Sequence, residues 1–280
     1  MQIGLRLHDA VKLPLEERLV KVKEQGFYCG HLALSKVVSE YSVKDSALTP
    51  GYAMYLKNLF QKNQLDVAVL GCYLNLATPN KEKLAQFMNR YEAHIRFASL
   101  LGAAVVGTET GAPNEAYEYE PACHTEESLE LFIERLRPVV RCAEKFGVIF
   151  AIEPVWNHIV STPKRARKVL DTINSPNLKI ILDPVNLLSM VNYKERDEVI
   201  AEAIELLGED VAMVHIKDFI IENDKMVSVG AGTGMMNYEQ ILRFIKKDKP
   251  FMHVTLENTN PDNAVWCKDF IQNQYDALIV

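Results

Sequence analysis

Apolar and polar positions alternate along the whole chain between two patterns: short apolar runs, and longer stretches in which apolar residues return with helical spacing. In the stretch after residue 14, for example, apolar residues stand at Leu15, Leu19 and Val22, which is typical of an amphipathic helix. The short apolar runs predict eight strands, at Ile3–Leu7, Tyr28–Leu34, Asp66–Leu70, Ala104–Gly107, Val148–Ile152, Lys179–Leu182, Val211–His215 and Met252–Leu256. The pattern therefore predicts strand–helix units from end to end.

The helical stretches lie between these strands and after the last one. They are Leu15–Gln25, Met54–Asn63, Lys81–Leu101, Glu126–Phe146, Pro163–Thr172, Glu195–Leu207, Tyr238–Lys246 and Asp262–Gln274. Several are followed at once by glycine, as at Gly102 and Gly147, which is a common way to end a helix. The looser stretches Ser35–Thr49, Thr110–His124 and Phe219–Asn237 each follow a strand, so we expect them to wall the face at the strands' C-terminal ends.

Eight strand–helix units in 280 residues match an α/β protein with the (β/α)8 TIM-barrel architecture, whose usual size is about 250 residues. An open, doubly wound sheet is the competing architecture, but it often carries a glycine-rich phosphate turn after its first strand. Here the residues after Leu7 are His-Asp-Ala-Val-Lys. No low-complexity linker divides the chain, so we expect one TIM-barrel domain over residues 1–280.

Composition and charge argue against several classes of function. Hydrophobic residues make up 48% of the chain and charged residues 24%, and the net charge is −6, which argues against a protein that mainly neutralises nucleic-acid phosphate. The five cysteines are widely spaced without a C-x-x-C pair, which indicates reduced thiols. No apolar run approaches the length of a membrane helix. We expect a cytoplasmic protein that binds neither membranes nor nucleic acid.

Four successive strands in the second half each end on a residue that can bind a metal ion: Glu153, Asp183, His215 and Glu257. Their spacing is close to one strand–helix unit, about 30 residues or more. A single acidic residue at a strand end is most often a helix cap or a solvated charge. Four of them at the same end of parallel strands would instead converge on one mouth, where barrel active sites lie. Three carboxylates and one imidazole suit Mn²⁺ or Mg²⁺ better than a thiolate-seeking ion.

Around these residues the chain resembles the divalent-metal sugar isomerase/epimerase superfamily with the xylose isomerase-like barrel. The segments that carry the resemblance are Ala151-Ile-Glu-Pro154, Leu182-Asp-Pro-Val-Asn186, Val214-His-Ile-Lys-Asp218, Gly230-Ala-Gly-Thr-Gly234 and Thr255-Leu-Glu-Asn258. The resemblance implies that Glu153, Asp183, His215 and Glu257 hold one divalent ion, Mn²⁺ first, with Mg²⁺, Co²⁺ or Zn²⁺ as alternatives. It also implies that Glu153 and Glu257 are the acid/base pair, that the substrate is a small sugar, and that a homo-oligomer is a common form.

The predicted chemistry is proton transfer next to a carbonyl of a ketose or ketose phosphate. A divalent ion polarises the carbonyl, one glutamate removes the proton of the adjacent carbon, and the resulting enediolate regains a proton. Return from the opposite face gives epimerisation, whereas return to the neighbouring carbon gives isomerisation.

Four further residues are predicted to contact the substrate: Asn186, Lys217, His158 and Glu109. Many sugar epimerases of the family have histidine at the position of Asn186, and an amide can still hold a sugar hydroxyl. For Lys217, a structural ion pair at the strand end is an equal alternative to substrate binding. Asp218 is expected to orient Lys217. A buried, hydrogen-bonded histidine is the structural alternative for His158.

Three other functions remain open at this point. A dehydratase of a polyol-derived ketone would share the proton abstraction and differ in losing a β-hydroxyl. An apurinic-site endonuclease would need several more histidine ligands and a basic surface, whereas this chain has seven histidines in all and a net charge of −6. A catalytically silent barrel acting as a binding subunit would lack a bound divalent ion.

Overall fold

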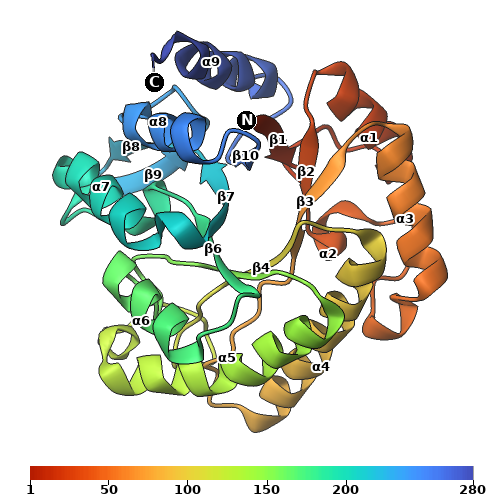
Figure 1. Ribbon diagram of the computed structural model, residues 1–280, viewed down its shortest axis with the longest axis vertical. Coiled ribbons are helices and arrows are strands. Elements are labelled where there is room, and N and C mark those ends of the chain that lie inside the picture. The colour runs from red at the N-terminus through yellow and green to blue at the C-terminus, as the bar shows by residue number, and fades with distance from the viewer. Residues whose placement is uncertain (280) are drawn as a thin grey trace.

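Eight parallel strands close into a barrel in the computed structural model, which describes residues 1–279 (Figure 1). They are β1 (Gln2–Arg6), β2 (Cys29–Leu32), β3 (Asp66–Gly71), β4 (Val105–Glu109), β5 (Phe150–Glu153), β6 (Leu178–Leu182), β7 (Val211–Ile216) and β10 (His253–Leu256). Strands that follow one another in this series are paired, and β1 pairs with β10 to complete the circle. The predicted single-domain TIM barrel is confirmed.

An outer ring of eight longer helices covers the barrel (Figure 1). They are α1 (Leu15–Glu24), α3 (Pro50–Lys62), α4 (Lys81–Leu101), α5 (Glu126–Phe146), α6 (Pro163–Ile173), α7 (Arg196–Leu207), α8 (Glu239–Asp248) and α9 (Ala264–Ala277). The predicted bounds of α4 and α5 are confirmed. Gly102 and Gly147 follow these two helices in the left-handed conformation, with φ of 79° and 64°. Within residues 1–279, no helix is both long and apolar enough to cross a membrane.

The inside of the barrel is filled by small and branched side chains rather than left open. Val69, Val105, Ala151, Ile181 and Met213, from five neighbouring strands, form one buried cluster there. Gly107 faces this cluster, and a Cβ atom at that position would lie 2.7 Å from Cδ1 of Ile181. The packed interior closes the barrel below the strand ends, so a ligand must approach from the C-terminal face.

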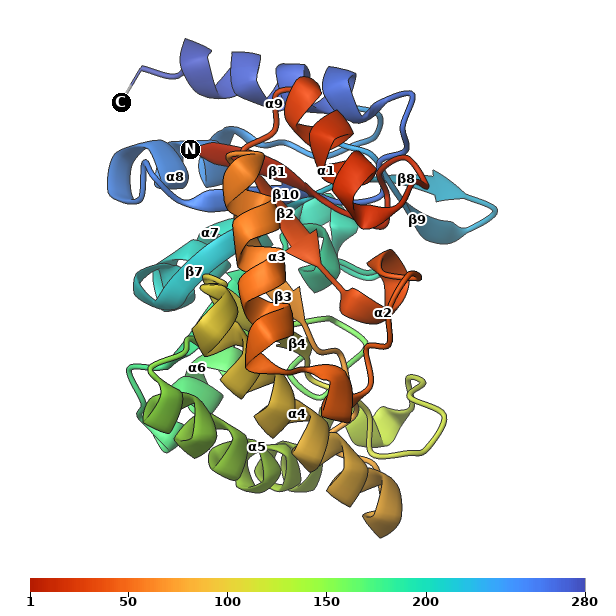
Figure 2. The same cartoon turned by 90° about the vertical axis from the view of Figure 1, so that its right-hand side faces the viewer.

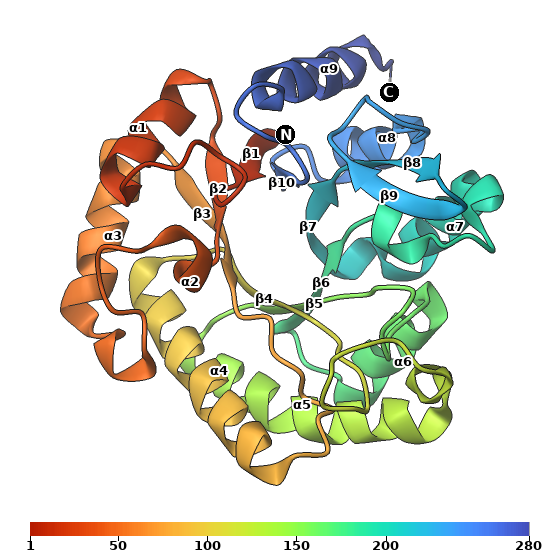
Figure 3. The same ribbon diagram turned by 180° about the vertical axis from the view of Figure 1, so that it is seen from behind.

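The connections at the C-terminal ends of the strands carry extra structure. The short helix α2 (Leu34–Val37) follows β2, and a hairpin of β8 (Asp218–Glu222) and β9 (Lys225–Val229) follows β7. In Figure 2 these elements lie on the side of the barrel opposite the two termini, and Figure 3 looks onto that face. The prediction of a loose stretch over Phe219–Asn237 is therefore wrong for its first half, where this hairpin was missed.

Asp218 holds this connection together. Its carboxylate accepts hydrogen bonds from the backbone N–H groups of Phe219, Gly232, Gly234 and Met236, at 2.8, 3.1, 2.9 and 2.8 Å. A Cβ atom on Gly234 would lie 2.2 Å from the carbonyl oxygen of Phe219, so the turn requires glycine there. The expectation that Asp218 orients the Lys217 side chain is wrong, because this carboxylate instead caps a tight glycine turn.

Candidate functional site

A cavity of about 370 Å³ opens at the C-terminal ends of the strands. Acidic and basic side chains dominate its wall. The lining residues are Arg6, His8, His31, Ala33, Lys36, Tyr73, Glu109, Tyr117, Glu153, Asn186, Lys217 and Glu257. Five of the eight residues predicted for the site therefore line this cavity, namely Glu109, Glu153, Asn186, Lys217 and Glu257. Asp183 and His215 are fully buried and contact these residues from below.

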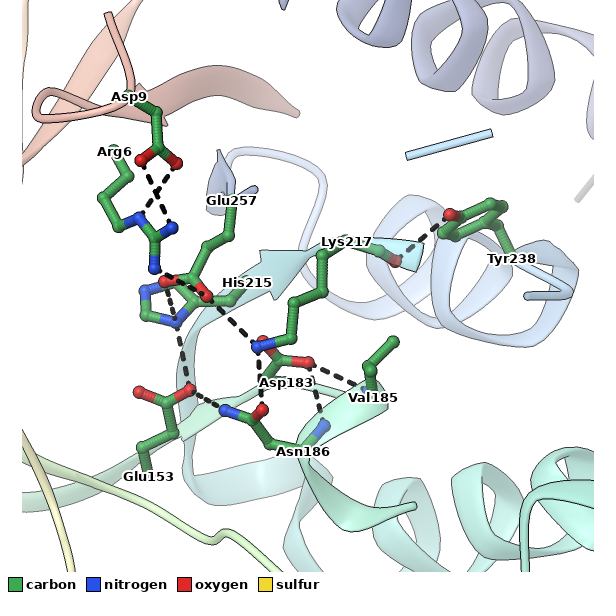
Figure 4. Close-up of polar contacts among 10 residues, drawn as sticks. All are labelled: Arg6, Asp9, Glu153, Asp183, Val185, Asn186, His215, Lys217, Tyr238 and Glu257. Atoms are coloured by element: carbon green, nitrogen blue, oxygen red, sulfur yellow. Dashed lines mark hydrogen bonds and ion pairs between the residues drawn. The ribbon is translucent and has the colours of Figure 1, made fainter. Parts of the chain in front are cut away.

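His215 is the centre of the predicted ligand set (Figure 4). Its Nδ1 atom lies 3.2 Å from Oε1 of Glu153 and 3.3 Å from Oε1 of Glu257. Glu153 is the last residue of β5, Glu257 follows β10 directly, and His215 is in β7 between them in the barrel order. The two carboxylates consequently approach one imidazole from different sides of the mouth.

Lys217 ties the remaining acidic groups together. Its Nζ atom lies 2.9 Å from Oδ2 of Asp183 and 3.2 Å from Oε2 of Glu257 (Figure 4). The same ammonium donates a hydrogen bond of 2.7 Å to Oδ1 of Asn186. Lys217 is only 6% exposed, so these contacts take place largely out of water. The strand-end ion pair considered from the sequence is present, and it lies on the cavity wall.

Asn186 links this group to Glu153. Its Nδ2 atom donates a hydrogen bond of 2.7 Å to Oε1 of Glu153, while its side-chain oxygen accepts from Lys217. The turn after β6 holds Asn186 in place, because Oδ1 of Asp183 accepts the backbone N–H groups of Val185 and Asn186 at 2.9 and 3.2 Å. An aspartate that closes a turn through its own side chain is a common local arrangement. Asp183 therefore presents only its other oxygen to Lys217.

The close packing of charges shifts the pKa values of these groups. Burial alone would lower the pKa of His215, but the carboxylates of Glu257 and Glu153 outweigh it and raise the pKa to about 9. Burial alone would raise the pKa of Glu257, but His215, Lys217 and Arg6 hold it well below its ordinary value. The pKa of Lys217 is raised because Asp183 and Glu257 outweigh the opposing effect of burial. Burial raises the pKa of Asp183. The cluster therefore contains an ionised Glu257 and a protonated imidazole.

The residues present fit a divalent ion. Glu153, Asp183 and His215 each place a ligand atom within 4.8 Å of the other two, and His31, His215 and Glu257 do the same. Nε2 of His215 is buried and has no hydrogen-bond partner among residues 1–279. The neighbouring carboxylates stabilise the proton on His215, and they could stabilise a bound cation in the same way. Oxygen ligands with a single imidazole suit hard or borderline divalent ions.

A second group of polar residues lines the side of the cavity near β4. Oε2 of Glu109, the last residue of β4, accepts a hydrogen bond of 3.1 Å from the hydroxyl of Tyr117. The ring of Tyr117 lies 5.1 Å from that of His158, centroid to centroid. Burial raises the pKa of Glu109 and lowers that of His158 to about 4. His158 stands behind these residues and does not line the cavity, so its contact with a substrate stays a prediction.

Sequence reasoning missed or left unassigned several residues of the wall. Arg6, at the end of β1, places its guanidinium 3.5 Å from Oε2 of Glu257 and pairs with Asp9 at 2.9 Å. His31 stacks on His215 with a centroid distance of 5.4 Å, and both its ring nitrogens lack hydrogen-bond partners within residues 1–279. The ring of Tyr73 also stacks on that of His31, with a centroid distance of 5.6 Å. The sequence signal that could have assigned Arg6 and His31 to the site was their position at or near the C-terminal end of a strand.

Comparison with known proteins shows the family of the chain. The model of the xylose isomerase-like TIM barrel matches residues 21–271. A probable L-ribulose-5-phosphate 3-epimerase of Mycoplasma pneumoniae is 27% identical over 216 residues, which is 73% of this chain and 66%, just under two thirds, of that protein.

Two solved structures share the fold at low sequence identity. A D-tagatose 3-epimerase-like protein has a TM-score of 0.75 and 20% identity, covering 99% of this chain and 97% of its own. The IolI protein with a binding zinc atom has a TM-score of 0.73 and 18% identity, covering 98% of each chain. With the family model spanning most of the sequence, the chain belongs to the xylose isomerase-like TIM barrel family.

Proposed function

We propose that the protein is a divalent-metal-dependent isomerase or epimerase of a ketose or ketose phosphate. The observation that carries this proposal is the placement of Glu153 and Glu257 on two sides of His215, at 3.2 and 3.3 Å, in the wall of the cavity at the strand ends. Two carboxylates that reach one small space from different strands can serve two faces of a substrate carbon. The epimerase names of the M. pneumoniae relative and of the structural neighbour support the same reaction class.

Glu153, Asp183, His215 and Glu257 would hold the ion. When bound, a divalent ion supplies polarisation of the substrate carbonyl, which makes the neighbouring C–H acidic. Mn²⁺ suits the ligand set best by charge and softness, with Mg²⁺, Co²⁺ and Zn²⁺ as alternatives. The zinc atom named for the IolI structure is consistent with an ion at this kind of site.

The proton transfers belong to the two glutamates. In epimerisation, an oxygen of one carboxylate takes the proton from the carbon beside the carbonyl, and the other carboxylic acid delivers a proton to the opposite face. Asn186 holds Oε1 of Glu153 through a hydrogen bond of 2.7 Å, so this carboxylate has a fixed orientation. Lys217 and Arg6 keep Glu257 ionised, because both cations lie within 3.5 Å of its Oε2 atom. Glu153 and Glu257 are 2% and 5% exposed, so bulk water has little access to their carboxylates.

The test is a panel of ketoses and ketose phosphates incubated in D₂O with the Mn²⁺-loaded protein. We expect deuterium at the carbon next to the carbonyl of at least one substrate, together with an epimer or isomer of that substrate. A product that has lost water and absorbs in the ultraviolet would identify a dehydratase instead. Absence of exchange with every compound, in protein shown to contain Mn²⁺, would overturn the proposal.

A further inference from the structure

A second cavity, of about 400 Å³, adjoins the first. The two cavities share His8 and Lys36 in their walls, and the second one extends along α2 and the start of α1. In Figure 3, α2 lies beside the mouth of the barrel, between the strands and the outer helices. None of the reaction steps proposed above uses this second space, which we call the side cavity.

The side cavity has a cationic wall. Lys12, Arg18 and Lys36 give this wall its positive charge. The uncharged groups of His8, Ser35 and Ser39 line it with them, and its lining contains no acidic residue. Lys12 and Lys36 are exposed, and within residues 1–279 neither forms an ion pair. Two free ammonium groups beside one cavity repel each other, and a bound anion would remove that repulsion.

Arg18 adds a fixed positive charge beneath this wall. It is 7% exposed, and its guanidinium donates to the carbonyl oxygens of Leu13 and Leu7, at 2.9 and 3.3 Å, rather than to a carboxylate. Glu40 flanks the wall, but its two oxygens accept the backbone N–H groups of Leu15 and Ser39, and it does not line the cavity. Among the described residues Arg18 forms no ion pair, although the charge of Glu40 acts on it from outside the cavity lining.

His8 stands where the two cavities meet, and its Nδ1 atom is buried without a hydrogen-bond partner in the described part of the chain. Burial, followed by the nearby cations Arg6 and Lys36, lowers the pKa of His8 to about 4, so its ring is neutral at pH 7. A binding site for the uncharged end of a sugar is expected to contain both hydrogen-bond donors and hydrogen-bond acceptors. Here the groups at the far end from Glu153 are positively charged donors and hydroxyls, which suits an oxyanion.

We propose that the substrate carries a terminal phosphate, which binds in the side cavity between Lys12, Lys36 and His8. The inference rests on the proposed function for the reacting end of the sugar, and on the side cavity alone for the phosphate. The acidic end of the combined space performs proton transfer, and the basic end holds the dianion. The separation of these two ends would then select substrates by the number of carbon atoms between the carbonyl and the phosphate.

The test compares a ketose with its terminal phosphate ester in the deuterium-exchange assay, using the Mn²⁺-loaded protein. The wild-type protein is expected to prefer the ester in kcat/KM by about 100-fold or more, as each charged hydrogen bond is worth about tenfold or more. Lys36→Met and Lys12→Met should each reduce this preference about tenfold. The matched control is Lys62→Met, an exposed lysine at the end of α3, which should leave the preference unchanged.

Equal use of the two substrates by the wild-type protein would overturn the inference, and so would lysine variants that slow both substrates by the same factor. Both results leave the proposed function standing. If no substrate exchanges, the proposed function fails, and titration with inorganic phosphate decides the inference separately. Binding that is lost in the Lys12→Met/Lys36→Met double variant would support the phosphate site, and binding that is absent or unchanged in that variant would refute it.

Discussion

Oε1 of Glu153 lies 3.2 Å from Nδ1 of His215, and both side chains are buried. A second carboxylate, that of Glu257, lies 3.3 Å from the same nitrogen. This imidazole is held in its charged form by neighbours that are themselves candidate ligands. The arrangement links protonation of His215 to metal binding, because the proton and the ion compete for the same negative charge.

Metal binding should therefore release a proton. With its pKa raised to about 9, His215 is protonated at pH 7.5 in the metal-free protein, and a ligand imidazole must be neutral. The apparent Mn²⁺ affinity is expected to fall by about tenfold for each pH unit below 9, with roughly one proton released per ion at pH 7.5. Calorimetric titration in two buffers of different ionisation enthalpy measures this number. Identical heats in both buffers would contradict the assignment.

The ligand set should also couple metal binding to stability. At a Mn²⁺ concentration 100 times the Kd, the folded protein gains about 2.7 kcal/mol, which corresponds to a rise in Tm of about 5–10 °C. Asp183→Asn removes a buried ligand and should abolish most of this rise. Asp171→Asn, on the exposed face of α6, is the matched control and should keep it. A full rise in the Asp183 variant would exclude that residue as a ligand.

Removal of the Lys217 ammonium should destabilise the metal-free protein more than the metal-bound one. Asp183 and Glu257 would lose a cation at 2.9 and 3.2 Å, and breaking one side of a buried ion pair costs about 3–5 kcal/mol. In Lys217→Met a divalent ion replaces part of the lost positive charge. Urea unfolding with and without Mn²⁺ separates the two states. An equal loss of stability in both would show that Lys217 and the ion do not share these carboxylates.

Asn186 is expected to act by positioning Glu153. Asn186→Ala removes the hydrogen bond of 2.7 Å to Oε1 of Glu153 and should lower kcat by about 10–100-fold with little change in bound Mn²⁺. Asn186→Asp keeps the size but places a carboxylate oxygen against Glu153, and should lower kcat further. Steady-state kinetics and metal quantification check both variants. A rise in KM with unchanged kcat would instead indicate the substrate contact predicted from the sequence.

Much of the architecture could be predicted from the sequence because each barrel strand is an apolar run followed by an amphipathic helix. The bounds of α4 and α5 followed from their glycine ends. The β8–β9 hairpin was missed because it lies in the connection after β7, outside the strand–helix repeat, although its strands contain apolar residues and Phe219 is buried. Asp218 was misassigned because its partners are backbone N–H groups of a distant glycine turn.

The candidate site followed from residue types at strand ends, which parallel strands bring to one face. What the sequence could not predict were contacts that depend on side-chain direction. Arg6 approaches Glu257 from the other end of the chain, and His31 stacks on His215 across the barrel. His158 packs against the ring of Tyr117 and does not line the cavity, and its contact with a substrate stays a prediction. Such relationships need the closed barrel, because no sequence spacing encodes them.

The central claim is that Glu153 and Glu257 move the proton. The most direct measurement is deuterium exchange at the substrate carbon beside the carbonyl, in Glu153→Gln and Glu257→Gln at matched Mn²⁺ occupancy. Glu127→Gln, exposed on α5, serves as the control. We predict that exchange falls by a factor of about 10²–10⁴ in each site variant and stays at the wild-type rate in the control. Exchange near the wild-type rate in either site variant, with the ion bound, would contradict the account.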